Sequence, residues 1–230
     1  MPDILLIETA TSLCSAALIQ GEEITASRET GEPRAHASKT AVFVDEILKE
    51  KGLRAADLDA VCVSSGPGSY TGLRVGSSTA KGLCFGAGIP LLSVCTLDIL
   101  VWQAIEGGLL PQGCKYIIPM IDARRMEVYT AIYSPDGKRL SEIEPDVIGP
   151  ESFSGQLAQG PVLFIGDGAG KCSGTITDSN AYFVQCNPHA SAMLKPALEA
   201  FRNGKFENTA YFEPFYLKQF VATVSKKNLF

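Results

Sequence analysis

Residues 63–84, with the sequence VSSGPGSYTGLRVGSSTAKGLC, place the strongest constraint on how this chain can fold. An apolar strand is predicted to end at Ser64, and a turn with glycines at 66, 68 and 72 leads into a helix. A strand, a glycine turn and a helix N-terminus together often form a cradle for a phosphate group. The same pattern also suits a helix that another backbone approaches closely, because glycine has no side chain. The choice between these interpretations decides the predicted function.

The spacing of the glycines does not match a known phosphate loop. A Walker loop needs GxxxxGK[ST], which the chain lacks, and GPGSYTG is one residue longer than the dinucleotide fingerprint GxGxxG. A second glycine turn, GDGAGK at 166–171, follows an apolar strand and fits either a nucleotide site or an ordinary strand-to-helix turn. The first turn is therefore interpreted as a tight turn at a helix N-terminus.

The helix after the first turn carries small residues on one face. Gly76 and Gly82 lie in its interior, where two glycines cost about 2 kcal/mol relative to alanine. Gly72, Gly76 and Ala80 recur at every fourth residue and form a smooth stripe. Such a stripe indicates that another backbone approaches closely, either the sheet of the same chain or a helix of a second subunit.

Composition and charge define the class of protein. Of the 230 residues, 46% are hydrophobic and 20% are charged, as in soluble globular proteins. The net charge is −5 without a run of like charge, so strong binding to nucleic acid by the chain alone is not expected. Seven cysteines without CxxC spacing indicate reduced, mostly buried thiols. No secretion signal or bilayer-spanning segment is recognised, and we expect a cytoplasmic protein.

The order of the predicted elements indicates a duplicated α/β unit with mixed sheets. The first unit, residues 1–106, is predicted to contain strands at 4–7, 14–19, 23–28, 58–64 and 89–94 and helices at 38–51, 71–85 and 96–106, with Ser38 as the N-cap of the first helix. The boundary is predicted at GGLLPQG, residues 107–113. The smaller second unit, residues 107–230, is predicted to contain strands at 115–121, 127–134, 142–148 and 162–165, helices from 150 and at 188–203, and an aromatic tail at 211–218 that docks back onto the body.

The two histidines do not indicate a catalytic or metal site. One helical turn after His36 the chain carries Thr40, so the second ligand that a metal pair needs is missing. His189 is predicted to lie at the surface near a helix start. No GxSxG nucleophile elbow occurs, so a hydrolase triad has no support.

Acidic and basic residues at two predicted strand ends are weaker candidates. Glu8 near the end of the first strand can approach a phosphate or a metal, although carboxylates there also cap turns. Asp122, Arg124 and Arg125 follow another strand, where a solvated hairpin is the commoner meaning. No residue is predicted to act as a nucleophile or a base.

Four stretches together resemble the TsaB (YeaZ) family. They are ILLIETATSLCSAAL at 4–18, DLDAVCVSSGPGSYTGLRVGSSTAKGL at 57–83, VCTLDIL at 94–100 and IDARRMEVY at 121–129. The resemblance covers most of the chain and is strongest at 57–83. It implies an actin/Hsp70/sugar-kinase-like (ribonuclease H-like) fold of two related domains, in agreement with the duplicated units.

The resemblance implies a non-catalytic scaffold and activator of the enzyme TsaD. In the family's complex, which also contains TsaE, threonylcarbamoyl is placed on N6 of adenosine 37 in ANN-decoding tRNAs, from threonylcarbamoyl-adenylate made by TsaC. No cofactor is expected on this chain: ATP and metal are expected on TsaD, whose HxxxH pair corresponds to His36 and Thr40 here. Contact with tRNA is expected only within the complex, and contact with a membrane is not expected. The alternative is a glycoprotease-like peptidase or an ATP-binding enzyme of the same fold.

The resemblance also implies that the helices at 38–51 and 71–86 bind TsaD, or a second copy of this chain in isolation. The small-residue stripe is thereby assigned to a docking face. No catalytic, cofactor-binding or metal-binding residue is assigned. The predicted interface residues are Ala41, Val44, Leu48, Gly72, Leu73, Gly76, Ser77 and Ala80.

Overall fold

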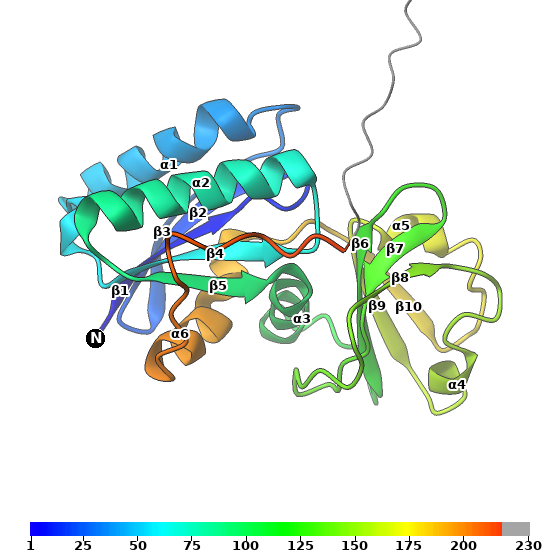
Figure 1. Ribbon diagram of the computed structural model, residues 1–230. Coiled ribbons are helices and arrows are strands. Elements are labelled where there is room, and N and C mark those ends of the chain that lie inside the picture. The colour runs from blue at the N-terminus through cyan, green and yellow to red at the C-terminus, as the bar shows by residue number, and fades with distance from the viewer. Residues whose placement is uncertain (218–230) are drawn as a thin grey trace, which may run out of the picture.

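The computed structural model describes residues 1–217, which form two five-stranded sheets covered by helices (Figure 1). In the first sheet, β1 (Asp3–Glu8), β2 (Cys14–Gln20) and β3 (Glu23–Thr30) are antiparallel. The strands β4 (Ala60–Gly66) and β5 (Leu91–Cys95) then run parallel to β1, in the order β3-β2-β1-β4-β5. Because each parallel connection needs a crossover, helices must cover this sheet.

The second sheet repeats this arrangement. β6 (Tyr116–Asp122), β7 (Glu127–Thr130) and β8 (Glu144–Val147) are antiparallel, and β9 (Val162–Gly166) and β10 (Ala181–Gln185) run parallel to β6. The order is β10-β9-β6-β7-β8. The prediction of a duplicated α/β unit with mixed sheets is confirmed, and β10 is a strand that the sequence pattern missed. Each sheet with its covering helices is called a lobe below.

α1 (His36–Lys51) and α2 (Tyr70–Ala87) lie side by side on one face of the first sheet (Figure 1). Their apolar residues join those of β1 and β4 in one core, in which Phe43 and Ile47 meet Leu5. This follows from the helical spacing of the apolar residues, which gathers them on one stripe.

The predicted cap of the first helix is wrong. The N-cap is Ala35, and Ser38 lies inside the first turn, where its Oγ donates to the carbonyl oxygen of Ala35 at 3.1 Å. The helix starts earlier because His36 Nε2 contacts the carbonyl oxygen of Thr11 at 2.9 Å, which fixes the start of the helix on the turn after β1. At the start of α2, Ser69 is the N-cap, and its Oγ accepts from the backbone N–H of Gly72 at 3.2 Å.

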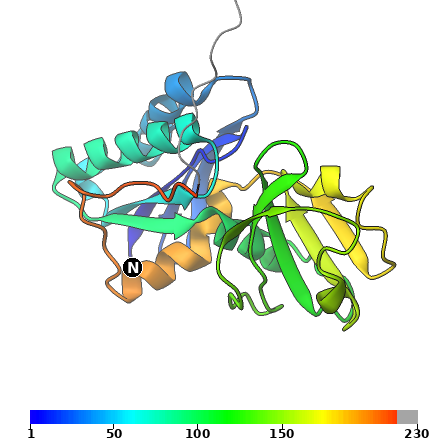
Figure 2. The same ribbon diagram turned by 45° about the vertical axis from the view of Figure 1, so that its right-hand side comes forward.

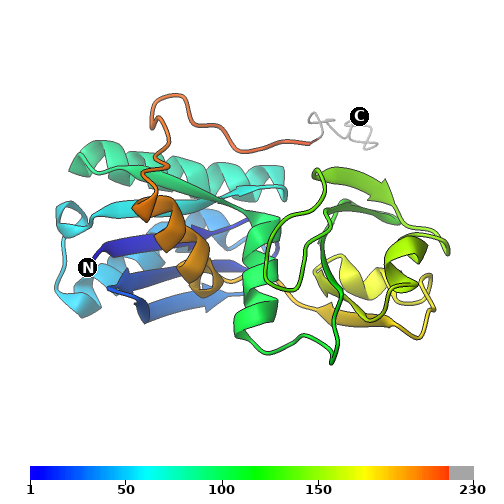
Figure 3. The ribbon, with the colours of Figure 1, turned by 90° about the horizontal axis from the view of Figure 1, so that it is seen from below.

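α3 (Thr96–Glu106) lies between the two lobes, as the view from below shows (Figure 3). Its Ile99 belongs to the core of the first lobe. Its Leu97, Leu100 and Val101 belong to the core of the second lobe, together with Ile117 of β6. The two lobes therefore share one helix.

A segment from the end of the described chain covers the other face of the first sheet. η2 (Ala190–Met193) and α6 (Leu194–Arg202) place Met193 and Ala197 against Ile4 and Leu6 of β1. Figure 2 shows α6 below the first sheet, away from β6–β10. The division at residue 107 stays a prediction, and residues 218–230 of the predicted second unit lie outside the described residues.

The remaining elements are short. They are η1 (Ala55–Asp57), α4 (Ser154–Leu157) and α5 (Ala169–Cys172). The predicted strand at 127–134 is interrupted after Thr130, and Tyr133 then bridges to Ile117 and to Arg139. All seven cysteines are free, and none of them is exposed. Among residues 1–217, no helix combines the length and the apolar character that crossing a membrane requires.

Candidate functional site: the α1–α2 face and the interlobe cleft

The small-residue stripe of α2 faces the sheet of its own chain. A side-chain carbon added at Gly72 would lie 2.1 Å from the carbonyl oxygen of Thr9, and one at Gly76 would lie 2.3 Å from Thr9 Oγ1. Side-chain carbons do not come this close to other atoms, so the two glycines are required where they are. Ala80 is fully buried as well. The backbone that approaches the stripe closely is therefore that of Thr9, the residue after β1 of the same chain.

Most of the predicted interface residues lie inside the chain. Ala41 is exposed, whereas the other seven are buried: Val44, Leu48, Gly72, Leu73, Gly76, Ser77 and Ala80. Their contact with a partner stays a prediction. A docking face on these two helices has to be built first from exposed residues.

The outer face of α2 consists of exposed residues spaced three or four apart, which places them on one side of the helix. Its members are Thr71, Arg74, Ser78, Gly82 and Phe85. Phe85 is 89% exposed, and a side-chain carbon at Gly82 would meet no heavy atom within 4 Å. On the neighbouring helix, Val42 is 43% exposed. An exposed phenylalanine beside small residues, with one charge in the row, is suited to contact with another protein.

A cleft of about 810 Å³ lies between the two lobes. Its first wall consists of residues 10–12 after β1 and the N-terminal ends of α1 and α2. Its second wall contains Asp122 at the end of β6 and Asp167 after β9, and residues 215–217 close one side. The carboxyl ends of parallel strands from both sheets meet here, which is the common place for a ligand in an α/β protein.

Glu8 lies fully buried at the end of β1. Its Oε1 accepts from the backbone N–H of Ala10 at 2.5 Å, whereas Oε2 has no hydrogen-bond partner among the described residues. Burial raises the pKa of this carboxyl group to about 8, against smaller opposing effects of Ala10 and of the nearby Ser64 hydroxyl. Ser64 Oγ and Thr96 Oγ1, at the ends of the neighbouring strands, are also buried without a well-formed hydrogen bond in the described structure. At neutral pH Glu8 is mostly uncharged and is suited to donate a hydrogen bond rather than to bind a cation.

The second glycine turn and the Asp122 hairpin form one hydrogen-bonded cluster. The backbone N–H of Asp122 donates to Asp167 Oδ1 at 2.9 Å, and Lys171 forms an ion pair with Asp122. Lys171 Nζ also donates to the carbonyl oxygen of Glu127 at 2.7 Å. Burial raises the pKa of Asp167 to about 6, and the carboxylate of Asp122 adds to this shift. The turn at 166–171 therefore joins β9 to β6 and contributes one carboxyl group, Asp167, to the cleft.

His36 and Thr40 do not fit a metal pair. His36 Nε2 is engaged with the carbonyl oxygen of Thr11, and Thr40 is buried with its hydroxyl donating to the carbonyl oxygen of His36 at 2.7 Å. Thr40 Oγ1 also lies 3.3 Å from Cys14 Sγ, which shows that it faces the core. Nowhere in residues 1–217 do three or more His, Cys, Asp or Glu side chains gather as a metal would require.

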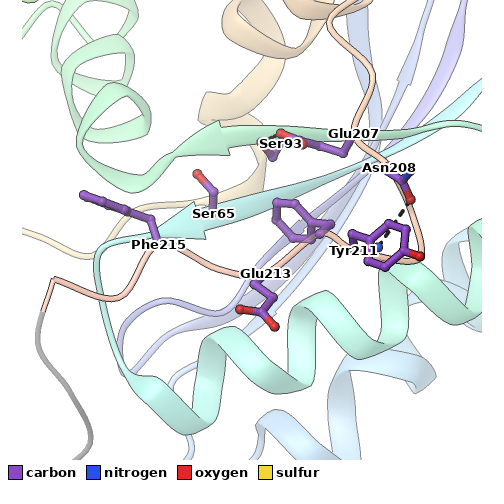
Figure 4. Close-up of a pocket in the computed structure, with 8 residues that line it drawn as sticks. Ser65, Ser93, Glu207, Asn208, Tyr211, Glu213 and Phe215 are labelled. Atoms are coloured by element: carbon purple, nitrogen blue, oxygen red, sulfur yellow. Dashed lines mark hydrogen bonds between the residues drawn. The ribbon is translucent and has the colours of Figure 1, made fainter.

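The tail runs back along α2 towards the cleft and covers a second, more open pocket of about 380 Å³ (Figure 4). Lys81 Nζ donates to the carbonyl oxygens of Ala210 and Phe212 at 3.1 and 3.0 Å. The backbone N–H of Phe215 donates to the carbonyl oxygen of Ser65 at 2.7 Å. Ser93 Oγ donates to Glu207 Oε1 at 2.6 Å, and Figure 4 shows this pair and Ser65 along the same pocket. The tail thus positions aromatic residues at the cleft; Lys218, at the end of the predicted tail, lies outside the described residues.

The structure also places the residues that sequence patterns left open or missed. His189 is half-buried, and its Nδ1 lies within hydrogen-bonding distance, 2.8 Å, of Glu29 Oε2 on β3. Asp167 and Thr11 were not singled out, although both line the cleft. Their places in the sequence could have marked them as candidates, because each residue comes soon after a buried strand. Functional side chains gather at the ends of such strands in α/β folds.

Comparisons with known proteins agree with this architecture. A family model described as TsaD, tRNA N6-adenosine threonylcarbamoyltransferase, matches residues 25–222. The tRNA threonylcarbamoyladenosine biosynthesis protein TsaB of Escherichia coli K12 is 33% identical over 229 residues, which cover 95% of this chain and 96% of that protein. TsaB of Haemophilus influenzae is 31% identical over 225 residues, covering 94% and 93% of the two chains. The solved structure of YeaZ from Pseudomonas aeruginosa superposes with a TM-score of 0.78 at 27% identity, covering 94% of this chain and 100% of that one.

Proposed function

Because the chain belongs to the TsaB (YeaZ) family, we propose that it serves the synthesis of threonylcarbamoyladenosine in tRNA as a non-catalytic subunit. In this proposal it binds and activates TsaD, which carries out the transfer to adenosine 37, and TsaE joins the same complex. Its proposed location is the cytoplasm, which contains the tRNA. The docking surface is formed by the outer face of α2 together with exposed residues of α1.

The outer face of α2 is the observation that carries the proposal. Phe85 is 89% exposed, and Gly82 leaves room for another backbone because, apart from its own helix backbone, no atom of the described residues lies within 4 Å of its missing side chain. A helix of a partner can therefore approach α2 at Gly82 and cover Phe85, as interfaces with central aromatic residues do. The buried stripe supports the surface from below by holding α2 close to β1.

The cleft supports a non-catalytic role. The Asp122 carboxylate is paired with Lys171, the Asp167 carboxyl group accepts from the backbone N–H of Asp122, and the buried Glu8 is mostly uncharged at neutral pH. No pair of a nucleophile and a base within hydrogen-bonding distance is found among these described residues, whereas covalent catalysis requires one.

The alternative is an enzyme of the same fold, either a glycoprotease-like peptidase or an ATP-binding protein. The cleft volume of about 810 Å³ is sufficient for a nucleotide. Calorimetry of the isolated full chain with ATP and magnesium, followed by an assay for ADP, separates this alternative: micromolar binding with turnover contradicts a non-catalytic role.

Deleting the gene in its own host tests the role in tRNA modification. We expect threonylcarbamoyladenosine to disappear from digested bulk tRNA in mass spectrometry, and the full chain supplied from a plasmid to restore it. Undiminished threonylcarbamoyladenosine in the deletion strain contradicts the proposal.

Gly82→Arg is expected to weaken binding to TsaD by at least about tenfold, since a long charged side chain then occupies the place of the approaching helix. Arginine fits into the free chain because the position is open. The measurement is co-elution with TsaD in gel filtration and titration by calorimetry. Gly174→Arg is the matched control, because Gly174 is equally open but lies in the second lobe. Equal affinity of Gly82→Arg and the unchanged chain shows that the interface lies elsewhere.

A further inference from the structure

Arginines whose side chains pair with no carboxylate of the described residues lie at the mouth of the interlobe cleft. Arg34 in the loop before α1 and Arg124 in the turn between β6 and β7 both line the cleft, and both are exposed. Arg125 follows in the same turn. None of the three side chains forms an ion pair within residues 1–217. The charged side chains that line the cleft are Arg34 and Arg124 together with Asp122 and Asp167, and the Asp122 carboxylate is paired with Lys171.

The backbone at these arginines adopts an uncommon conformation. The angle φ is 64° at Arg34, 72° at Arg124 and 52° at Arg125, a region that residues other than glycine seldom occupy. Among the other non-glycine residues that the structure describes, Phe153 alone shares it. Residues held in this way are concentrated at functional sites.

Aromatic side chains line the same cleft beside the arginines. They are Tyr70, Tyr129, Phe215 and Tyr216. The rings of Tyr70 and Tyr216 have centroids 4.9 Å apart, and the guanidinium carbon of Arg74 lies 4.9 Å from the centroid of Tyr70. Phe215 is 46% exposed. Proteins that bind single-stranded nucleic acid combine such features, because bases stack on aromatic rings while arginines contact the phosphates.

The first wall of the cleft adds further groups suited to an anion. The first turns of α1 and α2 contain no acidic residue, and both helices begin at the cleft. The partial positive charge of a helix N-terminus favours a phosphate. Thr11 Oγ1 lines the same wall, buried and without a partner among the described residues.

Deep in the cleft the groups do not suit a free nucleoside triphosphate. Asp167 would meet phosphates placed there, whereas the exposed Asp122 carboxylate is already paired with Lys171. The glycine turn before α2 is closed against the turn after β1: the backbone N–H of Ser69 donates to the carbonyl oxygen of Ala10 at 2.6 Å, and a side-chain carbon at Gly68 would lie 2.4 Å from the same atom. Exposed arginines beside the half-buried carboxyl group of Asp167 favour a ligand that lies across the opening.

We propose that the mouth of the interlobe cleft binds a single-stranded segment of RNA, with phosphates on Arg34 and Arg124 and bases against the aromatic side chains. The inference rests on the proposed function, and it assigns to this chain a contact with the tRNA that the complex modifies.

Fluorescence anisotropy of the full chain with a labelled anticodon stem-loop RNA tests this proposal. We expect binding at low salt, and the double variant Arg34→Gln/Arg124→Gln to bind at least about tenfold more weakly. The slope of log affinity against log salt should decrease by about 1.4, since each phosphate contact on a single strand contributes about 0.7. The matched control is Arg54→Gln/Arg202→Gln, which removes the same charge from arginines paired with Asp57 and Glu22 outside the cleft, and should leave the slope unchanged.

Three outcomes overturn the proposal. They are the absence of RNA binding by the unchanged chain at low salt, an equal loss in both double variants, and binding of magnesium ATP to Arg34 and Arg124 without binding of RNA. The cleft variant is expected to keep its co-elution with TsaD and its thermal unfolding temperature. Failure of RNA binding with intact restoration of threonylcarbamoyladenosine in the deletion strain therefore refutes this inference and leaves the proposed function standing.

Discussion

Replacing Gly72 by alanine should lower the free energy of unfolding by about 3 kcal/mol or more. The added carbon would overpack the contact between α2 and the turn after β1, and only a shift of the backbone can relieve it. The new carbon would lie 2.1 Å from the carbonyl oxygen of Thr9, a backbone atom that cannot rotate away. Either α2 moves off the sheet or the turn after β1 moves. Urea unfolding followed by circular dichroism measures the loss.

The control is the same substitution at Gly82, on the exposed face of α2. Gly82→Ala should raise the free energy of unfolding by about 1 kcal/mol. Gly82 is exposed and an added side-chain carbon would meet no described atom outside its helix within 4 Å. Alanine also loses less backbone conformational entropy than glycine when the helix forms. Equal effects of the two substitutions would show that the close contact of Gly72 with Thr9 does not hold in solution.

Replacing Glu8 by glutamine should make the chain markedly more stable at pH 8 and leave it nearly unchanged at pH 5. The pKa of Glu8 is raised from 4.5 to about 8 by burial, so between these values the folded chain holds a proton that the unfolded chain has released. Stability therefore falls as pH rises through this window, by up to roughly 5 kcal/mol in total. Glutamine stays uncharged in both states and keeps an oxygen for the backbone N–H of Ala10.

The measurement is the free energy of unfolding in urea at half-unit steps from pH 5 to pH 8. The difference between Glu8→Gln and the unchanged chain should grow with pH and level off near pH 8. Glu23→Gln, at an exposed position on β3, is the matched control and should follow the unchanged chain. A constant difference across the range is incompatible with a buried protonated Glu8. Asp167, whose pKa is raised to about 6, adds a smaller decrease in the same direction between about pH 4 and 6 in both proteins.

The duplicated pattern of strands and helices was predictable from local sequence, and so was the class of fold. Alternating apolar segments and glycine turns mark most of the strands and helices in both halves. Element ends were less predictable: Ser38 has the chemistry of an N-cap, but the contact of His36 with Thr11 starts α1 earlier. The short strand β10 was missed because a five-residue segment gives little periodicity.

The glycine stripe shows what a sequence pattern specifies and what it leaves open. The spacing of Gly72 and Gly76 correctly indicated that a backbone comes close, but the pattern is the same whether that backbone belongs to β1 or to another protein. Which backbone it is depends on how α2 packs against the sheet in the folded chain. The cleft could not be predicted for a similar reason: Arg34, Arg124 and Phe215 are far apart in sequence and are brought together by two sheets and a tail.

The last described residues complete the core that the first residues begin. Met193 and Ala197 cover Ile4 and Leu6, and Phe212 belongs to the core that contains Leu5. During synthesis, the strands of the first lobe therefore leave the ribosome with their isoleucine and leucine side chains uncovered. The face that Met193 and Ala197 cover stays open until residues 190–200 have emerged, although domains generally begin to fold as they are made. Completion of this lobe therefore waits for the synthesis of this segment, and a nascent chain halted before residue 190 presents an apolar sheet face to chaperones.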